Sequence, residues 1–286
     1  TTWLVAVNAS ATDAAFEVTL AGESRALQPG PLRGVVLPAR RATAFDLNSF
    51  ALGERALAAT VRASLGRIAV SVIGVDERGL RAGIGVRVLS RTWDLPASEA
   101  DSSGALGVLS GRSETPFRVR SKGAEAQDVL TDVSVPPLRA GSFAVSASGS
   151  FSAASEGPAP FATVRRLART GVPDEAALVG APAGARVWAA PPVGPPEAGG
   201  GSLLIQNPAG RPARATVSLL GPSGPVAASE QAIDLGPGQT QEIDLSDQTS
   251  PVSALVQAET GTVVVARSVV WAGGFATALA LPVRLV

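Results

Sequence analysis

The 286-residue sequence contains no Cys, no His, no Met and no Tyr. Without Cys, the chain forms no disulfides and offers no thiolate for catalysis or metal binding. Without His, it excludes Ser–His–Asp triads and most zinc or iron sites, which depend on imidazole. The absence of Met indicates that the native start lies upstream, and that this chain is a mature or trimmed part of a longer one.

Charge imbalance and long apolar runs are also missing. Lys+Arg and Asp+Glu both total 24, so the formal net charge is zero. A neutral chain is not expected to bind nucleic acid or to attach to a membrane through a polybasic patch. No apolar run reaches the roughly 18 residues that a membrane-spanning helix needs, so no such helix is expected here.

The residues that are present favour short strands joined by tight turns. Hydrophobic residues make up 45% of the chain, which contains 31 Gly and 22 Pro but only 4% aromatics. This content is sufficient to bury hydrophobic cores. Small apolar residues alternate with polar ones over several stretches, and such period-two alternation is typical of half-buried strands.

A repeated segment organises the chain. Ser202–Gly221 aligns without a gap on Trp3–Gly22, which places Asn207 on Asn8. Each copy predicts a strand, a tight turn and a second strand, an opening hairpin with one buried face. The chain is therefore expected to be built from repeats of this unit.

Later segments extend the repeat. Gly34–Leu47 and Ala56–Val75 predict two further hairpins, the second with its turn at Leu65-Gly66. Their counterparts are Gln231–Leu245 and Ser253–Val270. About seven strands in about ninety residues indicate an immunoglobulin-like sandwich, although the disulfide and core Trp of antibody domains are absent.

We therefore expect an all-β chain of three tandem immunoglobulin-like β-sandwich domains in an elongated array. Repeat 1 covers 1–91, a divergent repeat 2 covers 92–187, and repeat 3 covers 188–286, with a Pro/Gly linker at 190–201. The Pro-rich half of this linker should be stiff and extended, and its Gly-rich half should be flexible.

The middle repeat is harder to interpret. Phe143–Ser155 resembles the later hairpins, with Gly149 at its turn, and the unit is short enough to have lost or reshaped a strand pair. Pro173-Asp174-Glu175 begins like a helix, so a short helix is predicted at Asp174–Leu178.

Carboxylates are the acid–base groups that remain. They cluster at Asp76-Glu77, at Glu99 with Asp101, and at Asp174-Glu175. Paired carboxylates serve glycoside hydrolysis, and oxygen ligands suit calcium. Each cluster lies in a predicted turn or linker, where solvated acids are ordinary, so no catalytic residue, metal ligand or cofactor is predicted.

Two pairs of polar residues recur at equivalent repeat positions. Asp46 and Asp244 each end a predicted strand, where they are expected to point outward or to bond a turn backbone. Asn8 and Asn207 follow the first strand, where an Asx-type turn is expected. Asn8-Ala9-Ser10 also matches the glycosylation sequon, but a structural role for Asn8 in the turn is preferred over glycosylation.

Trp3, Trp93, Trp188 and Trp271 are the candidate interaction residues. Exposed Trp side chains in a strand array can stack on sugar rings. Three of the four lie at the starts of repeats, where packing at the seam between neighbouring sandwiches is the simpler interpretation.

The repeated motifs also resemble a known family. Strand–Asn-x-(Ala/Ser)–strand, a Pro turn with an Asp-Leu strand end, and Val-x-Ala-x-x-Gly are similar to an uncharacterised extracytoplasmic family of actinobacteria, high-GC Gram-positive bacteria. The resemblance implies tandem sandwich modules behind an N-terminal membrane anchor, encoded near a membrane glycosyltransferase. It supplies no catalytic residue.

Three functions follow from these observations. The first is a non-catalytic extracytoplasmic scaffold or accessory subunit of the cell envelope, partnering a membrane protein such as a glycosyltransferase. The second is a carbohydrate-binding array that uses exposed Trp side chains. The third, a remote alternative, is a hydrolase that works with carboxylates alone.

Overall fold

The computed structural model describes residues 1–77, 79–121, 129–145, 148–172, 174–192, 201–226, 229–248, 250–271 and 274–283. These residues form antiparallel strands and a short 3-10 turn at Gly30–Leu32, so the all-β prediction is confirmed. Within the described ranges, no helix reaches the length and apolarity needed to cross a membrane.

The strands fall into three groups along the chain, which we call the first, middle and last units. The first unit contains β1 (Thr2–Asn8), β2 (Ala14–Gly22), β3 (Ala26–Leu27), β4 (Val35–Leu37), β5 (Arg41–Asp46), β6 (Leu57–Leu65), β7 (Ala69–Asp76) and β8 (Gly79–Ile84). The middle unit contains β9 (Thr92–Leu95), β10 (Asp101–Ser110), β11 (Thr115–Ser121), β12 (Val129–Val135), β13 (Ala140–Phe143), β14 (Phe151–Ser155), β15 (Phe161–Arg169) and β16 (Glu175–Val179). The last unit contains β17 (Val187–Ala190), β18 (Gly201–Gln206), β19 (Ala213–Gly221), β20 (Gly224–Pro225), β21 (Gln231–Leu235), β22 (Thr240–Asp244), β23 (Ser253–Thr260), β24 (Val264–Trp271), β25 (Gly274–Leu279) and β26 (Leu281–Pro282).

Each unit has a four-stranded sheet of the same order, which we call sheet I. The orders are β5-β1-β7-β8, β13-β10-β15-β16 and β22-β18-β24-β25. The other sheet of each unit, sheet II, is centred on β2, β11 or β19. The pairings between named strands stay within one unit. Sheet I of the middle unit has kept all four strands, so no strand pair has been lost from it.

The predicted hairpins are wrong, because the paired runs lie in opposite sheets. β1 pairs with β5 and β7, whereas β2 pairs with β3, β4 and β6. The connections from β1 to β2, from β4 to β5 and from β6 to β7 therefore pass from one sheet of the unit to the other. Period-two alternation shows that a strand has one buried face, but it does not show which neighbour the strand pairs with.

Two predictions for the middle unit are also corrected. Gly149 lies between β13 of sheet I and β14 of sheet II, so it does not close a hairpin. The predicted helix lies mostly in β16, which pairs with β15. Ala176 and Leu178 of β16 are buried in an apolar cluster shared with the last unit, and this packing overrides the local helix-start signal.

Burial occurs inside the units and also between them. Three apolar clusters each draw on one stretch of chain, with buried members spanning 4–51, 93–161 and 181–280. A fourth cluster joins Leu167 and Leu178 of the middle unit to Leu204 and Phe275 of the last unit. A smaller one joins Ala21 and Ala56 of the first unit to Ala140.

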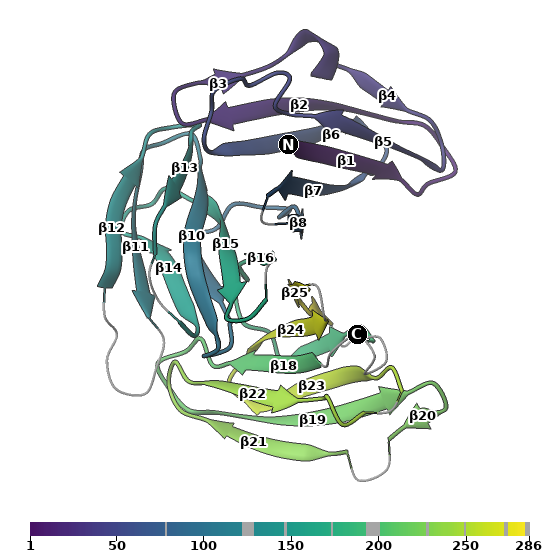
Figure 1. The fold of residues 1–286 in the computed structure, drawn as a ribbon, viewed down its shortest axis with the longest axis vertical. Helices are drawn as coiled ribbons and strands as arrows, with labels where there is room; N and C mark the ends of the chain where they lie inside the picture. Colours follow the sequence, from purple (N-terminus) through teal and green to yellow (C-terminus); the bar gives the residue numbers. More distant parts are fainter. Residues whose placement is uncertain are drawn as a thin grey trace.

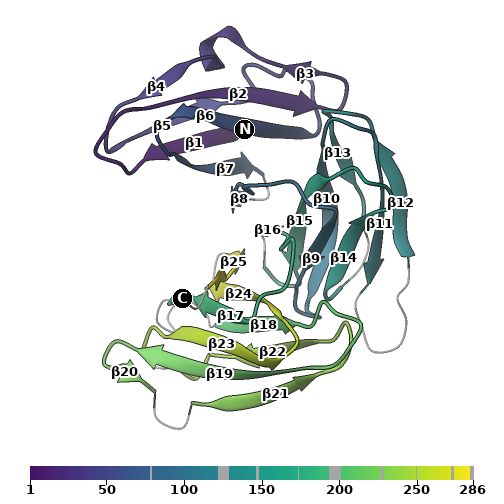
Figure 2. The same ribbon diagram turned by 180° about the vertical axis from the view of Figure 1, so that it is seen from behind.

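The units do not run in a straight line, which corrects the expectation of an elongated array. Figures 1 and 2 show them curving into an open arc, with β8, β16 and β25 gathered at its inner side. β16 packs against both β8 and β25 there. Of the predicted linker at 190–201, residues 193–200 lie outside the described residues.

Candidate functional site

Asn8 and Asn207 tie together two of the sheet-to-sheet connections in their units. The Asn8 side-chain amide donates to the carbonyls of Thr12 and Leu37, at 2.8 and 3.1 Å, and its Oδ1 accepts the Ser10 amide at 3.0 Å. Asn207 does the same with Arg211, Leu235 and Ala209, at 2.8, 3.1 and 3.0 Å. The predicted Asx turns are confirmed, and the buried Asn8 amide is not available for glycosylation.

The repeated Asp residues also bond to their own turns. Asp46 Oδ1 accepts the backbone amide of Asn48 at 3.0 Å, and Asp244 Oδ1 accepts that of Ser246 at 2.9 Å. The prediction that they bond a turn backbone is confirmed. These side chains shape the repeat and do not converge on one site.

Trp93 and Trp188 are buried inside their own units, so neither can stack on a sugar ring. Each lies in the apolar cluster of its unit, at 0% and 2% exposure. Their indole Nε1–H groups donate to the backbone carbonyls of Phe161 and Val263, at 2.8 and 2.7 Å. The two residues hold β9 and β17 on their units and do not fill a seam between units.

Trp3 and Trp271 are the candidate interaction residues that reach solvent, at 37% and 39% exposure. Trp3 is in β1 of the first unit, and Trp271 ends β24 of the last unit. The structure brings none of the four Trp residues into one binding platform.

Asp76 and Glu175, which belong to two of the predicted acid clusters, converge where β8 meets β16, and two arginines pair with them. Arg81 Nη1 donates to Asp76 at 3.0 Å and lies 3.5 Å from Glu175. Arg166 donates to Glu175 at 2.7 Å and lies 3.8 Å from Asp76. Glu175 has only 8% of its side chain exposed, so removing one partner would leave a buried charge uncompensated. Arg81 belongs to the first unit and Glu175 to the middle unit, so this ion pair joins the two.

Another pair stands between the middle and last units. Arg169 bonds the fully buried Asp101 at 2.6 Å and lies over the Phe275 ring at 5.5 Å. Ser98 donates to Glu242 at 2.5 Å across the same seam. Asp101 of the third predicted acid cluster is thus paired as well, and sequence reasoning missed its Arg partner because that partner lies 68 residues away.

Asp174 lies where all three units meet. A Cβ added at Gly79 in β8 would lie 1.8 Å from its carboxylate, and one added at Gly274 in β25 would lie 2.3 Å from it. Both glycines therefore leave room for this side chain. This contact could not be predicted from local sequence, because the three residues belong to three different repeats.

Two buried arginines occupy equivalent positions in the middle and last units. Arg165 donates to Gly149 O and stacks on the Phe151 ring, and burial lowers its pKa to about 9. Arg267 donates to Val252 O at 3.0 Å and also to Pro191 O, and burial lowers its pKa to about 10. Both bond to backbone carbonyls in the interior, so their guanidinium groups serve the packing of their own units.

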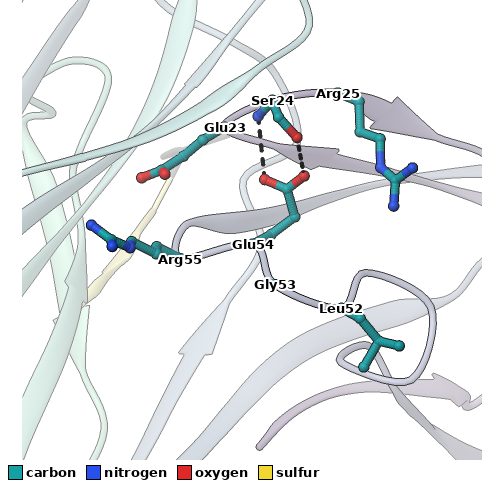
Figure 3. Close-up of a pocket in the computed structure, with 7 residues that line it drawn as sticks. All are labelled: Glu23, Ser24, Arg25, Leu52, Gly53, Glu54 and Arg55. Atoms are coloured by element: carbon teal, nitrogen blue, oxygen red, sulfur yellow. Dashed lines mark hydrogen bonds between the residues drawn. The ribbon is translucent and has the colours of Figure 1, made fainter.

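A shallow depression of about 360 Å³ lies on the first unit (Figure 3). Its lining residues come from two loops: Glu23, Ser24, Arg25, Leu52, Gly53, Glu54 and Arg55. The Glu54 carboxylate accepts the Ser24 hydroxyl and backbone amide, and these bonds lower the pKa of Glu54. Glu54 therefore joins the two loops as an anion and is a poor general base. Among the described residues, no three acids gather as a metal site would require.

The outer face of sheet I in the first unit carries an uncovered row of large apolar side chains, which we call the apolar face. Leu4 and Ala6 point into the core, so Trp3 and Val7 point outward. The register continues the row across β7 and β8, where Trp3 lies opposite Ile73 and Val75 opposite Leu80. The exposed members, all at 37% or more, are Trp3, Val7, Val75, Leu80 and Ile84.

The equivalent face of the last unit is covered. There Leu204, Ala266 and Phe275 of β18, β24 and β25 pack against Leu167 and Leu178 of the middle unit. The same face of the same sheet is thus an interface in the last unit and exposed to solvent in the first.

Comparison with known proteins adds little functional information. Residues 1–106 match the model of a family described as "Family of unknown function (DUF5719)". This part of the chain therefore resembles an uncharacterised family. No curated protein matches.

Two solved structures show partial likeness. The crystal structure of Thermotoga maritima 1070 is 22% identical with a TM-score of 0.31, and the match covers 35% of this chain and 96% of that chain. A mutant of the major pilin from Streptococcus pyogenes is 9% identical with a TM-score of 0.20, covering 97% of this chain and 98% of that chain. Both scores are low, so neither likeness defines what this chain does.

Proposed function

We propose that this chain is a non-catalytic interaction scaffold built from three immunoglobulin-like β-sandwich modules, and that it binds a protein through the apolar face. The observation that carries the proposal is the uncovered row of Trp3, Val7, Val75, Leu80 and Ile84. A contiguous apolar patch on a folded protein is typical of an interaction site. The covered counterpart in the last unit supports this, because the same sheet face there already serves as an interface.

We further propose an extracytoplasmic location at the cell envelope, through an N-terminal anchor, beside a membrane protein such as a glycosyltransferase. This part of the proposal rests on the resemblance of the repeated motifs to an extracytoplasmic family. The neutral net charge favours a partner that is recognised by apolar contact over one recognised by charge.

The engagement of the acids by arginines supports a non-catalytic role. Asp76 and Glu175 share two guanidinium groups, and Asp101 is bonded to a third. A general acid or nucleophile needs a carboxylate that faces a substrate, and ion pairs of this kind hold the carboxylates for structural use.

The test is co-purification from native membranes, with one double variant of the apolar face and one single variant as its control. Leu80→Ser with Ile84→Ser makes the apolar face polar, whereas Val36→Ser changes an equally exposed residue on β4, at 63% exposure. We expect the membrane glycosyltransferase to co-purify with the parent chain and with Val36→Ser, and to be lost from the double variant. Equal recovery with all three proteins would reject the apolar face as the binding surface.

Carbohydrate binding is the second candidate, because Trp3 and Trp271 keep more than a third of their surface in solvent. Aromatic rings that are exposed in this way can stack on sugar rings. Titration with cell-wall glycans should then shift Trp fluorescence in the parent chain and in Leu80→Ser, but less in Trp3→Ala with Trp271→Ala. A shift that survives the loss of both residues would exclude this candidate.

A further inference from the structure

Sheet II of the first unit has an open edge where the other two units have an additional strand. In the middle unit β9 pairs with β14, and in the last unit β17 pairs with β23. The equivalent of β14 and β23 in the first unit is β6, which among the described residues pairs only with β2. Within the described part of the chain, one side of β6 therefore has no strand beside it.

The register fixes how the units correspond. Val61 of β6 lies opposite Val18, and Val256 of β23 lies opposite Val217. Both pairings also shift register at the same place, two residues beyond those valines on β6 and β23. Val61 is therefore the counterpart of Val256, which faces Trp188 on its other side.

The side chains beneath the additional strand show what it covers. In the last unit they are buried, at 5% exposure or less: Val256, Ala258, Val263 and Val265. Their counterparts in the first unit are partly or fully exposed: Val61, Ala63, Ile68 and Val70. The first unit thus has the same apolar row without its cover.

We infer that the open edge of β6 binds an extended peptide strand from outside residues 1–286, and that this strand places a Trp opposite Val61. We call the space beside this edge of β6 the slot. The strands that fill the equivalent space in the other two units, β9 and β17, indicate the chemistry of the occupant. Both carry a Trp followed three residues later by Pro, as in Trp93 with Pro96 and Trp188 with Pro191. This mode of binding is strand addition to an exposed sheet edge, with backbone hydrogen bonds for affinity and a side-chain pocket for specificity.

The carbonyl that would accept the incoming indole N–H can also be identified. Val263 O accepts the Trp188 indole, and Val263 lies two residues after Gly261. Ile68 lies two residues after Gly66, so it is the counterpart. Among the described residues, no Trp side chain donates to Ile68.

One difference defines the end of the slot. In the last unit Arg267 bonds Pro191 O and so holds the end of β17. The counterpart of Arg267 in the first unit is Val72, a partly buried residue of the core. The end of the incoming strand is therefore held by apolar contact, without a guanidinium.

The slot predicts which amides the strand would protect. In the last unit the Ala258 amide donates to Arg186 O at 2.7 Å, just before β17. Ala63 is its counterpart, and alternate residues of a strand point to the same neighbour. The Ala59, Val61 and Ala63 amides should therefore face the open edge. This edge belongs to sheet II, so the inference is separate from the binding proposed for the apolar face of sheet I.

Hydrogen exchange with the 286-residue chain tests the inference. The probe is the peptide Arg186–Pro192, added in solution and also fused ahead of Thr1 through a flexible linker, which raises its effective concentration to about the millimolar range. We expect exchange at Ala59, Val61 and Ala63 to slow by at least about tenfold in the fusion. The matched control carries Trp188→Ala within the peptide and should give little protection.

A second variant tests whether the protection depends on the open edge of β6. Ala63→Pro removes an N–H that faces the open edge, while the pairing of β6 with β2 keeps its bonds on the other side. It should abolish the protection at Ala59 and Val61 without unfolding the chain. No protection in either the added or the fused form, protection outside β6, or equal protection with the Trp188→Ala peptide would each overturn the inference.

Discussion

Gly274→Ala should weaken the point where the three units meet. The new Cβ would lie 2.3 Å from Asp174 Oδ2, 3.1 Å from Asp174 Cγ and 2.9 Å from the Trp271 ring. Asp174 cannot easily withdraw, because Gly79 lies against its other side. Overpacking of this kind costs about 1–3 kcal/mol. The measurement is urea unfolding, with the radius of gyration from small-angle scattering as a second readout of an opened arc.

Two further variants make this prediction specific. Gly210→Ala, in the same unit, meets nothing within 4 Å and should leave the free energy of unfolding within about 0.5 kcal/mol of the parent. Asp174→Ala combined with Gly274→Ala should recover part of the loss, as expected for residues in contact. If Gly274→Ala behaves like Gly210→Ala, or if Asp174→Ala gives no recovery, Asp174 does not join the units as described.

Three other changes have defined outcomes. Asn207→Ala and Asn8→Ala should each lower the free energy of unfolding by about 2–4 kcal/mol, because buried carbonyls lose their donor, and chemical denaturation measures this. Glu175→Gln should cost about 1–3 kcal/mol and make stability less sensitive to salt, since Arg81 and Arg166 lose a carboxylate. The hydrogen bonds from Ser24 hold the pKa of Glu54 below its ordinary value of 4.5. The stability that the Glu54 carboxylate contributes is therefore complete above pH 4.5 and is lost as the pH falls through the lowered pKa. Glu54→Gln should flatten the pH dependence of the free energy of unfolding below pH 4.5.

The strands and the repeat could be predicted because their signals lie within short segments of the sequence. Alternation placed the runs around Val18 and Val217, and the shared Asn marked the same turn twice. Each Asn closes a turn within a few residues of itself, so its role follows from sequence alone.

Strand pairing could not be predicted in the same way. β1 and β2 are separated by five residues, as a hairpin would allow, yet they lie in opposite sheets. In the folded chain Asn8 also bonds Leu37 O, 29 residues away, and so holds two of the sheet-to-sheet connections together. A contact of this sequence separation leaves no local pattern.

Residues at the contacts between units were the hardest to foresee. The helix predicted at Asp174–Leu178 failed because β16 is buried against neighbours that lie far away in sequence. Trp93 and Trp188 were expected at seams, whereas their indoles bond within their own units. Nothing in the local sequence separates a core Trp from a solvent-facing one such as Trp271.

The way β17 is delivered limits how this chain can be divided. Ala185 bridges to Val263 before β17 begins, and β17 then pairs with β23, so both contacts lie within the last unit. A fragment intended to fold as the last unit must therefore start before Ala185. Exchange of modules between related proteins would likewise have to carry each leading segment along with the sandwich that it closes.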